Sequence, residues 1–163
     1  MKKALFLDRD GVINVEKNYL HKIEDFELVD GIIELCKHYQ NSGYIVVVVT
    51  NQSGIARGYY SEDDFSVLSE WMLEYFKSLG VYIAKIYHCP HTDSDNCNCR
   101  KPRTGMFLDA KRELNIDMAS SIMIGDSERD IVAARDSGVG YGVLLGSGES
   151  SADRVVSSLR ELL

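Results

Sequence analysis

The sequence lacks any apolar run that approaches the roughly 18 residues a membrane-spanning helix needs. The lysines Lys2 and Lys3 precede a hydrophobic stretch that is too short for a signal peptide. Both absences argue against export and against a membrane partner. We therefore expect a soluble, cytoplasmic protein.

The sequence also has fewer positively than negatively charged residues. The chain has 18 Lys and Arg against 25 Asp and Glu, so its net charge is −7. A surplus of negative charge repels the phosphate backbone of nucleic acids, which argues against nucleic-acid binding. It does not exclude a small anionic substrate, because the local field at the site decides that.

Long Pro- or Gly-rich linkers, internal repeats and low-complexity segments are missing as well. No G-x-G-x-x-G follows the first apolar stretch, which disfavours a dinucleotide-dependent oxidoreductase. The length of 163 residues suits one domain, residues 1–163, with a sizeable core. Nothing in the sequence demands more than a monomer.

What the chain does contain is a regular alternation of strand and helix patterns. Short apolar runs predict strands over residues 4–7, 44–49, 84–88, 121–124 and 141–145. Helical periodicity and capping residues predict helices from Asp30 to Gly43, Ser61 to Gly80, Thr104 to Leu114, Ser127 to Gly138, and about Ser151 to Leu163. This order predicts an α/β fold with a parallel sheet and helices on both of its faces.

Polar residues suited to one phosphate and one hard cation follow three of these strands. Asp8 and Asp10 follow the first strand, Thr50 follows the second, and Asp126 follows the fourth. Ligands of such sheets bind at the carboxyl ends of the strands, so we expect these side chains to converge. Taken singly, each residue has a commoner meaning, as a solvated strand end, a turn or, for Lys101, an exposed cation.

The chemistry that this set favours is phosphoryl transfer. Asp8 is the candidate nucleophile, since a carboxylate can attack phosphorus once the repulsion between the two anions is removed. Mg²⁺ held by Asp8, Asp126 and the Asp10 carbonyl would remove it. The Asp10 side chain is then free to act as general acid and base, while Thr50 and Lys101 stabilise the phosphoryl oxygens.

Three of the four cysteines lie close together, with a histidine among them. The cluster consists of Cys89, His91, Cys97 and Cys99. Four N and S donors predict a tetrahedral structural Zn²⁺ site, although the one-residue gaps are tighter than in zinc fingers. A disulfide is disfavoured in a reducing compartment, and His88 competes with His91 as a ligand. A folded zinc loop over residues 89–101 would position Lys101 at its end.

Four short motifs resemble those of the haloacid dehalogenase-like phosphatases: Asp8-Arg9-Asp10-Gly11, Thr50-Asn51, Lys101-Pro102 and Gly125-Asp126. Along nearly its whole length the chain is most similar to the D,D-heptose 1,7-bisphosphate phosphatase family, especially in the segments FLDRDGVIN, TNQSGIARG, CPH…CNCRKPRTGM and NIDMASSIMIGD. The resemblance implies a Rossmann-like three-layer sandwich with a zinc-binding loop and no cap domain. It also implies a Mg²⁺-dependent phosphatase that removes the 7-phosphate of a sugar bisphosphate through an aspartyl-phosphate. That step leads to nucleotide-activated heptose for bacterial lipopolysaccharide.

The resemblance further implies which residues contact the sugar or its phosphates: Glu16, Lys17, Asn18, Tyr19, Asn51, Gln52, Ser53 and Arg100. A Lys often follows the motif aspartate in relatives, whereas Ser127 stands at that position here. Arg57 and Arg103 are therefore candidates to bind the remote phosphate in its place.

Two other functions stay open. The histidinol-phosphate phosphatases share the four motifs and the cysteine loop, and the gap between His91 and Cys97 looks closer to theirs. Arg57 favours the heptose family, because a second anionic group needs a cation. A zinc-stabilised module that binds a sugar phosphate without catalysis is disfavoured, because Asp8 and Asp10 are both intact.

Overall fold

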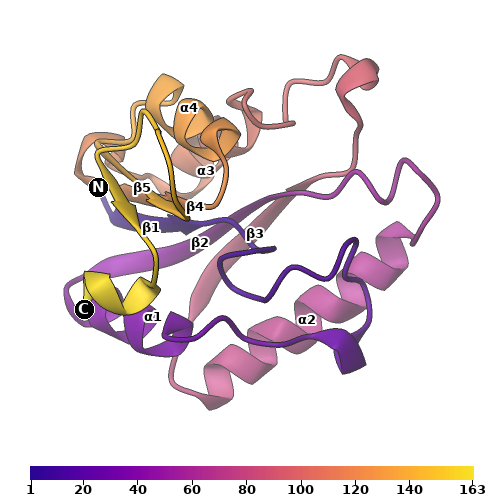
Figure 1. Ribbon diagram of the computed structural model, residues 1–163, viewed down its shortest axis with the longest axis horizontal. Helices are drawn as coiled ribbons and strands as arrows, with labels where there is room; N and C mark the ends of the chain where they lie inside the picture. The colour runs from indigo at the N-terminus through magenta and orange to yellow at the C-terminus, as the bar shows by residue number, and fades with distance from the viewer.

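The computed structural model describes residues 1–163 and contains one six-stranded parallel sheet (Figure 1). In sheet order the strands are β3 (Ile83–Cys89), β2 (Tyr44–Asn51), β1 (Lys3–Leu7), β4 (Ile122–Gly125), β5 (Tyr141–Leu145) and β6 (Arg154–Val156). Neighbouring strands are parallel throughout. The central strands are covered on both faces, which is why their sequences are apolar runs without alternation.

Helices cover both faces of this sheet. They are α1 (Ile32–Asn41), α2 (Glu62–Ser78), α3 (Gly105–Leu114) and α4 (Glu128–Asp136). Figure 1 shows α1 and α2 below the sheet and α3 and α4 above it. The predicted three-layer α/β fold is therefore confirmed. None of the helices is long and apolar enough to cross a membrane.

The strand β1 connects the two cores of the molecule. Leu5 and Leu7 pack in the core between the sheet and the helices α1 and α2, whereas Ala4 and Phe6 pack in the core between the sheet and the helices α3 and α4. Successive side chains of a strand point to opposite faces, so one strand contributes to both layers. The first residue beyond it, Asp8, therefore emerges at the carboxyl edge of a fully packed sheet.

Serine caps begin two of the helices as predicted. Ser61 and Ser127 start α2 and α4, and Asp64 and Asp130 complete a capping box with each of them. Thr104 is the N-cap residue of α3, but its side chain makes no capping hydrogen bond.

The predicted cap of α1 by Asp30 is wrong. Gly31 is the N-cap residue and has a φ of 87°, which glycine adopts without strain. The Asp30 carboxylate instead accepts hydrogen bonds from Arg160 at 2.8 and 2.9 Å. A cation from the far end of the chain is thus its partner, in place of helix N–H groups.

The predicted C-terminal helix over residues 151–163 is also wrong. Arg154–Val156 form β6 on the edge of β5, and Leu159–Leu162 form a 3-10 turn. The open edge of β5 offers backbone hydrogen-bond partners, and two consecutive valines suit a strand. Val156 and Leu159 are buried nonetheless, whereas Val155 and Leu163, which the helical spacing would place on the same face, are exposed.

Candidate active site

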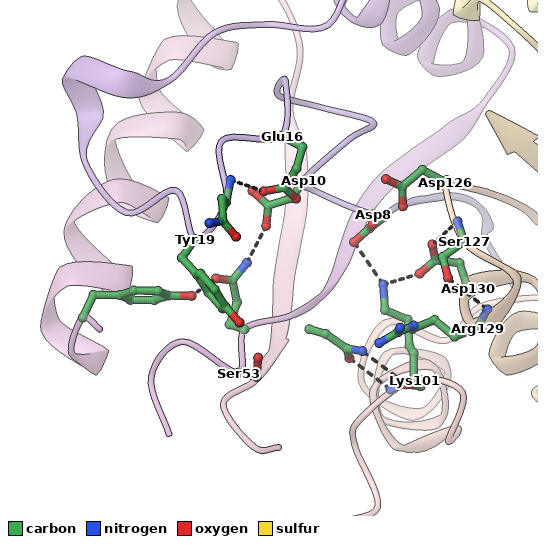
Figure 2. A pocket seen from close by; sticks show the side chains of 14 residues that line it. Asp8, Asp10, Glu16, Tyr19, Ser53, Lys101, Asp126, Ser127, Arg129 and Asp130 are labelled. Carbon is green, nitrogen blue, oxygen red and sulfur yellow. Dashed lines mark hydrogen bonds and ion pairs between the residues drawn. The ribbon is translucent and has the colours of Figure 1, made fainter. Parts of the chain in front are cut away.

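Three carboxylates and one buried ammonium group meet at the carboxyl edge of the sheet (Figure 2). Asp8 follows β1, Asp126 follows β4, and Asp130 lies in the first turn of α4. The Lys101 Nζ lies 3.0 Å from Asp8 Oδ1 and 2.6 Å from Asp130 Oδ1. It also donates a hydrogen bond to the Val49 carbonyl at 2.8 Å. Three partners use all three donors of the ammonium, which fixes Lys101 in place.

These groups change one another's protonation. Burial and the negative charge of Asp130 raise the pKa of Asp8 well above its ordinary value, and Lys101 offsets this only in part. Burial and Asp130 also raise the pKa of Asp126. Burial by itself lowers the pKa of Lys101, but Asp130 and Asp8 outweigh it and raise that pKa. With three carboxylates and one cation, the cluster is short of positive charge.

A divalent cation fits that deficit. One carboxylate oxygen from each of the three aspartates lies within 4.8 Å of the others, and oxygen donors are those that Mg²⁺ prefers. Asp130 is already engaged, since Oδ1 binds Lys101 and Oδ2 accepts a hydrogen bond from the Ser127 N–H at 3.2 Å. Asp8 and Asp126 are therefore the carboxylates that remain for a cation.

Two glycines make room for these carboxylates. A Cβ at Gly11 would lie 2.0 Å from Asp126 Oδ2, and Gly11 has a φ of +90°. A Cβ at Gly125 would lie 2.3 Å from the Cβ of Asp130. A larger residue at either position would displace a carboxylate, so the glycines of both motifs are required by the packing of the site.

Asp10 lies in different surroundings from Asp8. Its Oδ1 accepts hydrogen bonds from Arg9 Nη2 and Asn14 Nδ2, both at 3.0 Å. Its Oδ2 accepts one from Gln52 Nε2 at 3.0 Å. Hydrogen-bond donors therefore surround the carboxylate of Asp10, whereas other carboxylates crowd that of Asp8.

The end of β2 contributes Thr50 and Asn51. Thr50 is fully buried, and its hydroxyl accepts a hydrogen bond from Gln52 Nε2 at 2.9 Å. The Asn51 amide binds the main chain of Lys101 twice, donating to its carbonyl at 3.2 Å and accepting from its N–H at 3.0 Å. Asn51 thus fixes the main chain that carries Lys101.

An open cleft of about 320 Å³ lies at this edge of the sheet. The predicted site residues that line it are Asp8, Asp10, Glu16, Asn18, Tyr19, Asn51, Gln52, Ser53, Lys101 and Asp126. The lining also includes Tyr60, Ser127, Arg129 and Asp130, none of which the sequence predicted as site residues.

Four predicted cations lie outside the lining of the cleft: Lys17, Arg57, Arg100 and Arg103. Lys17 pairs with Glu27 at 2.9 Å, and Arg100 pairs with Asp93 at 2.7 Å. Arg103 donates a hydrogen bond to the Cys97 carbonyl, and Arg57 is exposed. The cation of the lining that makes no ion pair is Arg129.

Asp130 has a second role that its local sequence pattern does not predict. The S-x-x-D pattern marks it as one half of a capping box with Ser127, and the structure confirms that role. Only one carboxylate oxygen is used for the cap, and the other binds Lys101 from a distant loop. No spacing in the sequence encodes that second contact. For Arg129, the only available signal is its place three residues after the motif aspartate.

The loop over residues 16–19 borders the cleft in an unusual backbone conformation. Asn18 and Tyr19 have φ values of 58° and 70°, although neither is glycine. Each such conformation costs about 1–2 kcal/mol. Glu16 supports the turn by accepting a hydrogen bond from the Asn18 N–H at 2.5 Å, and the Tyr19 ring packs edge-on against Tyr59. Strain of this kind is typical of loops that hold a ligand.

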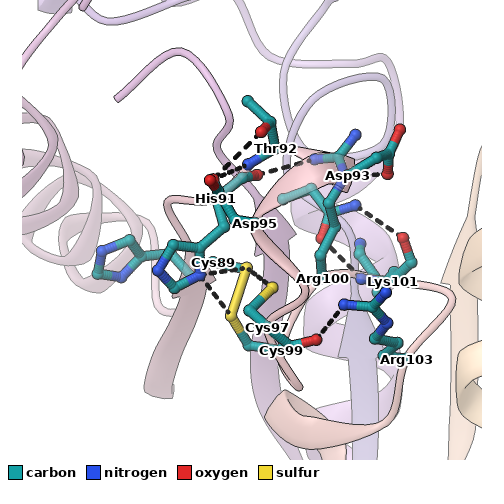
Figure 3. The surroundings of a disulfide bond; sticks show 12 residues. Cys89, His91, Thr92, Asp93, Asp95, Cys97, Cys99, Arg100, Lys101 and Arg103 are labelled. Carbon is teal, nitrogen blue, oxygen red and sulfur yellow. Dashed lines mark hydrogen bonds and ion pairs between the residues drawn. A yellow bond between two sulfur atoms is a disulfide. The ribbon is translucent and has the colours of Figure 1, made fainter. Parts of the chain in front are cut away.

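The cysteine cluster lies beside this site, and its four side chains gather at one point (Figure 3). The Sγ of Cys89 lies 3.6 Å from the Sγ of Cys97 and 3.5 Å from His91 Nδ1, which lies 3.4 Å from Cys99 Sγ. A tetrahedral zinc site with Zn–S of about 2.3 Å and Zn–N of about 2.0 Å has edges of roughly 3.5 to 3.8 Å. These three distances therefore fit a zinc ion.

One pair in the cluster departs from the prediction. The structure joins Cys89 and Cys99 in a disulfide, with an S–S distance of 2.36 Å and a Cα–Cα distance of 5.5 Å. The reducing compartment expected from the sequence disfavours a disulfide. A disulfide uses two of the four donors, whereas zinc uses all four, including His91. The alternative ligand His88 is directed elsewhere, since its Nε2 lies 2.9 Å from Glu62.

Comparisons with known proteins agree with this geometry. A family model described as polynucleotide kinase 3 phosphatase matches residues 3–139. The chain is 49% identical to D-glycero-alpha-D-manno-heptose-1,7-bisphosphate 7-phosphatase of Campylobacter jejuni, over 99% of this chain and 94% of that protein. It is 45% identical to D-glycero-beta-D-manno-heptose-1,7-bisphosphate 7-phosphatase of Haemophilus ducreyi, over 99% and 97%.

A solved structure is similar as well. It is the crystal structure of D,D-heptose 1,7-bisphosphate phosphatase from B. bronchiseptica complexed with magnesium and phosphate. It superposes with a TM-score of 0.87 at 30% sequence identity, over 98% of this chain and 95% of that one.

Proposed function

The chain belongs to the polynucleotide kinase 3 phosphatase family of haloacid dehalogenase-like phosphatases, and we propose that it removes the 7-phosphate of D-glycero-D-manno-heptose 1,7-bisphosphate. The observation that carries this proposal is the cluster of Asp8, Asp126, Asp130 and Lys101 beside the donor-bound Asp10. Relatives 43–49% identical over nearly the whole chain carry that activity in their names. The product enters the synthesis of nucleotide-activated heptose.

The first half-reaction transfers the phosphoryl group to the protein. A carboxylate oxygen of Asp8 forms a bond to phosphorus, and the bond between phosphorus and the C7 oxygen of the sugar breaks. Asp10, protonated at the start, gives its proton to that leaving oxygen. The Thr50 hydroxyl stabilises the charge on the phosphoryl oxygens, and Lys101, whose three donors already have partners, does so through its positive charge.

The second half-reaction restores Asp8. Asp10, now a carboxylate, takes a proton from a water molecule, whose oxygen forms a bond to phosphorus. The bond between phosphorus and Asp8 breaks, inorganic phosphate leaves, and Asp10 is protonated again. One acid/base residue thus serves both halves.

Magnesium would be held by the carboxylates of Asp8 and Asp126 and by the main-chain carbonyl of Asp10. When bound, it neutralises the repulsion between Asp8 and the phosphate. The raised pKa values of Asp8 and Asp126 support this assignment, because they reflect a shortage of positive charge at the cluster.

Zinc is the proposed occupant of the cysteine cluster, with Cys89, His91, Cys97 and Cys99 as ligands. Its role is structural, because all four tetrahedral positions are filled by protein donors. Since Cys99 is two residues from Lys101, a bound zinc would hold the segment that places Lys101 between Asp8 and Asp130.

The remote phosphate at C1 is proposed to bind Arg129. Of the two cations that line the cleft, Lys101 is fully paired and Arg129 makes no ion pair. Arg129 would thereby compensate for Ser127, and it replaces Arg57 and Arg103 as the candidate. Glu16, Asn18, Tyr19 and Ser53 remain the proposed contacts of the sugar.

The test is phosphate release with Mg²⁺, measured in parallel for both anomers of heptose 1,7-bisphosphate and for histidinol phosphate. We expect kcat/KM for one of the two bisphosphate anomers to exceed that for histidinol phosphate by at least about 10²-fold, since a second phosphate adds charged hydrogen bonds. A preference for histidinol phosphate would overturn the proposed substrate. No release from any of the three would favour a binding module without catalysis.

A further inference from the structure

The side chain of Gln52 joins two groups of the proposed active site. Its Nε2 donates hydrogen bonds to Asp10 Oδ2 at 3.0 Å and to Thr50 Oγ1 at 2.9 Å. Its Oε1 accepts a hydrogen bond from the Tyr60 hydroxyl. Gln52 is 3% exposed, and a primary amide has only two N–H donors, so both of them are used within the protein.

Tyr60 determines which way this amide points. Burial raises the pKa of Tyr60 to about 12, so its hydroxyl is protonated at neutral pH and donates a hydrogen bond to Gln52 Oε1. In the reverse orientation the NH₂ group would face the Tyr60 hydroxyl proton, and the amide oxygen would face Asp10, which repels it whenever Asp10 is ionised. Both ends of the amide therefore favour the same orientation, with the NH₂ group toward Asp10 and Thr50.

Tyr60 is itself held firmly. It is 7% exposed, and its ring stacks on His21 with centroids 5.1 Å apart and planes within 9°. Gly54 leaves the space for it, because a Cβ there would lie 2.2 Å from the Tyr60 ring. The main chain of Gln52 is anchored too, since its N–H donates to the Cys89 carbonyl at 2.7 Å.

We propose that Tyr60 and Gln52 are positioning residues that aim the Asp10 carboxylate at the leaving oxygen. The bond to Thr50 Oγ1 holds the second N–H of the amide, which keeps the first directed at Asp10 Oδ2. The inference rests on the proposed function, in which Asp10 is the general acid, and it reassigns Gln52 from substrate binding to positioning.

The test compares two phosphate esters that differ in their need for an acid. The C7 oxygen of heptose 1,7-bisphosphate must be protonated as it leaves, whereas the nitrophenolate of p-nitrophenyl phosphate leaves without a proton. For Gln52→Leu we expect kcat/KM to fall by about 10²-fold with the bisphosphate and by less than about 5-fold with the nitrophenyl ester. Turnover of the bisphosphate by the wild type tests the proposed substrate. The positioning role is tested separately, by the ratio of kcat/KM of the variant to that of the wild type on any alkyl phosphate that the wild type hydrolyses.

Tyr60→Phe makes the second arm, because it removes the hydroxyl and keeps the ring. We expect a loss of about tenfold in kcat/KM for the bisphosphate, with KM changed less than twofold. In the Gln52→Leu background the same substitution should cost nothing further, since Tyr60 acts only through Gln52. If the fall in kcat/KM of the double variant equalled the product of the falls of the two single variants, the proposed chain of hydrogen bonds would be overturned.

Tyr87→Phe is the matched control. Tyr87 is 8% exposed and its hydroxyl donates to Glu113 Oε1 at 2.6 Å, away from the cleft. We expect it to lower the melting temperature as Tyr60→Phe does and to leave kcat/KM unchanged. Equal losses on both esters, or a raised KM at unchanged kcat for Gln52→Leu, would overturn the positioning role.

Discussion

Two clusters of chemically active side chains draw on residues 89–101, and they differ in what neutralises their charge. The cysteine cluster takes its donors from Cys89 to Cys99, and the acidic cluster takes its cation, Lys101, from the end of the segment. The acidic cluster contains its own cation, because Lys101 binds both Asp8 and Asp130. The cysteine cluster consists of three cysteines and one histidine and has no Lys or Arg of its own. Its side chains are held together by a disulfide or by an added zinc. The acidic cluster can therefore assemble with the fold, whereas the cysteine cluster depends on a bond between its members.

This difference predicts that the two clusters fail in different ways. Changes in the acidic cluster act on the reacting atoms directly. Changes in the cysteine cluster act at a distance, through the main chain that runs from Cys99 to Lys101. Activity should therefore be lost with residues 89–101 still ordered in the first case, and together with the order of that segment in the second.

The largest effect is expected from Asp8→Asn. The amide cannot form the acyl phosphate, so kcat should fall by about 10⁴-fold or more. The fold should persist, because the substitution removes one of the crowded carboxylates and Lys101 keeps Asp130. Steady-state phosphate release and a thermal melt check both statements. Activity near that of the wild type would rule out Asp8 as nucleophile.

The next effect is expected from Lys101→Met, which removes the built-in cation. Two buried carboxylates lose their partner, so Mg²⁺-free protein should lose about 3 kcal/mol of unfolding free energy. Activity with Mg²⁺ should fall by about 10³-fold. Denaturant unfolding and phosphate release are the measurements.

Lys85→Met is the matched control for that substitution. Lys85 pairs with Glu113 at 2.8 Å on the exposed surface, where solvent screens the pair. It should leave both the melting temperature and the activity unchanged. If the two variants lost equal stability, the burial of Lys101 would not be the cause.

Removal of zinc should have a smaller effect on turnover. A chelator, with Mg²⁺ restored afterwards, should increase hydrogen exchange across residues 89–101 and lower kcat by about 10²-fold, because Lys101 shifts. Fresh protein should contain one zinc per chain, and Cys36→Ala, a change of the buried thiol outside the cluster, should not alter that content. Zinc-free protein whose loop loosens with a reductant alone would establish the disulfide between Cys89 and Cys99 instead.

The smallest effect is expected from Arg129→Ala. Loss of one charged contact to the remote phosphate should raise KM for the bisphosphate about tenfold at unchanged kcat. KM for heptose 7-phosphate, which lacks the C1 phosphate, should not change. Arg57→Ala is the control, since Arg57 is exposed outside the cleft. The opposite pattern in the two variants would restore the assignment made from the sequence.

Much of the fold was predictable because its signals are local. The apolar runs that became β1, β2 and β4 have no alternation, since both faces of those strands are covered. The prediction for the C-terminal segment was wrong because its structure depends on a contact that is not local. Its apolar spacing fits a helix, but the open edge of β5 recruits it as β6, and a single sequence does not contain the position of that edge.

The sequence by itself determined that Asp8, Asp10, Thr50 and Asp126 stand at strand ends, because parallel strands bring their carboxyl ends to one edge. Only the tertiary structure decided the partners: Asp130 beside Lys101, and Gln52 turned toward Asp10 by Tyr60. The physical reason is range. Periodicity and capping act within a few residues, whereas a buried charge or amide takes the complementary group that the packing of distant segments brings within about 3 Å.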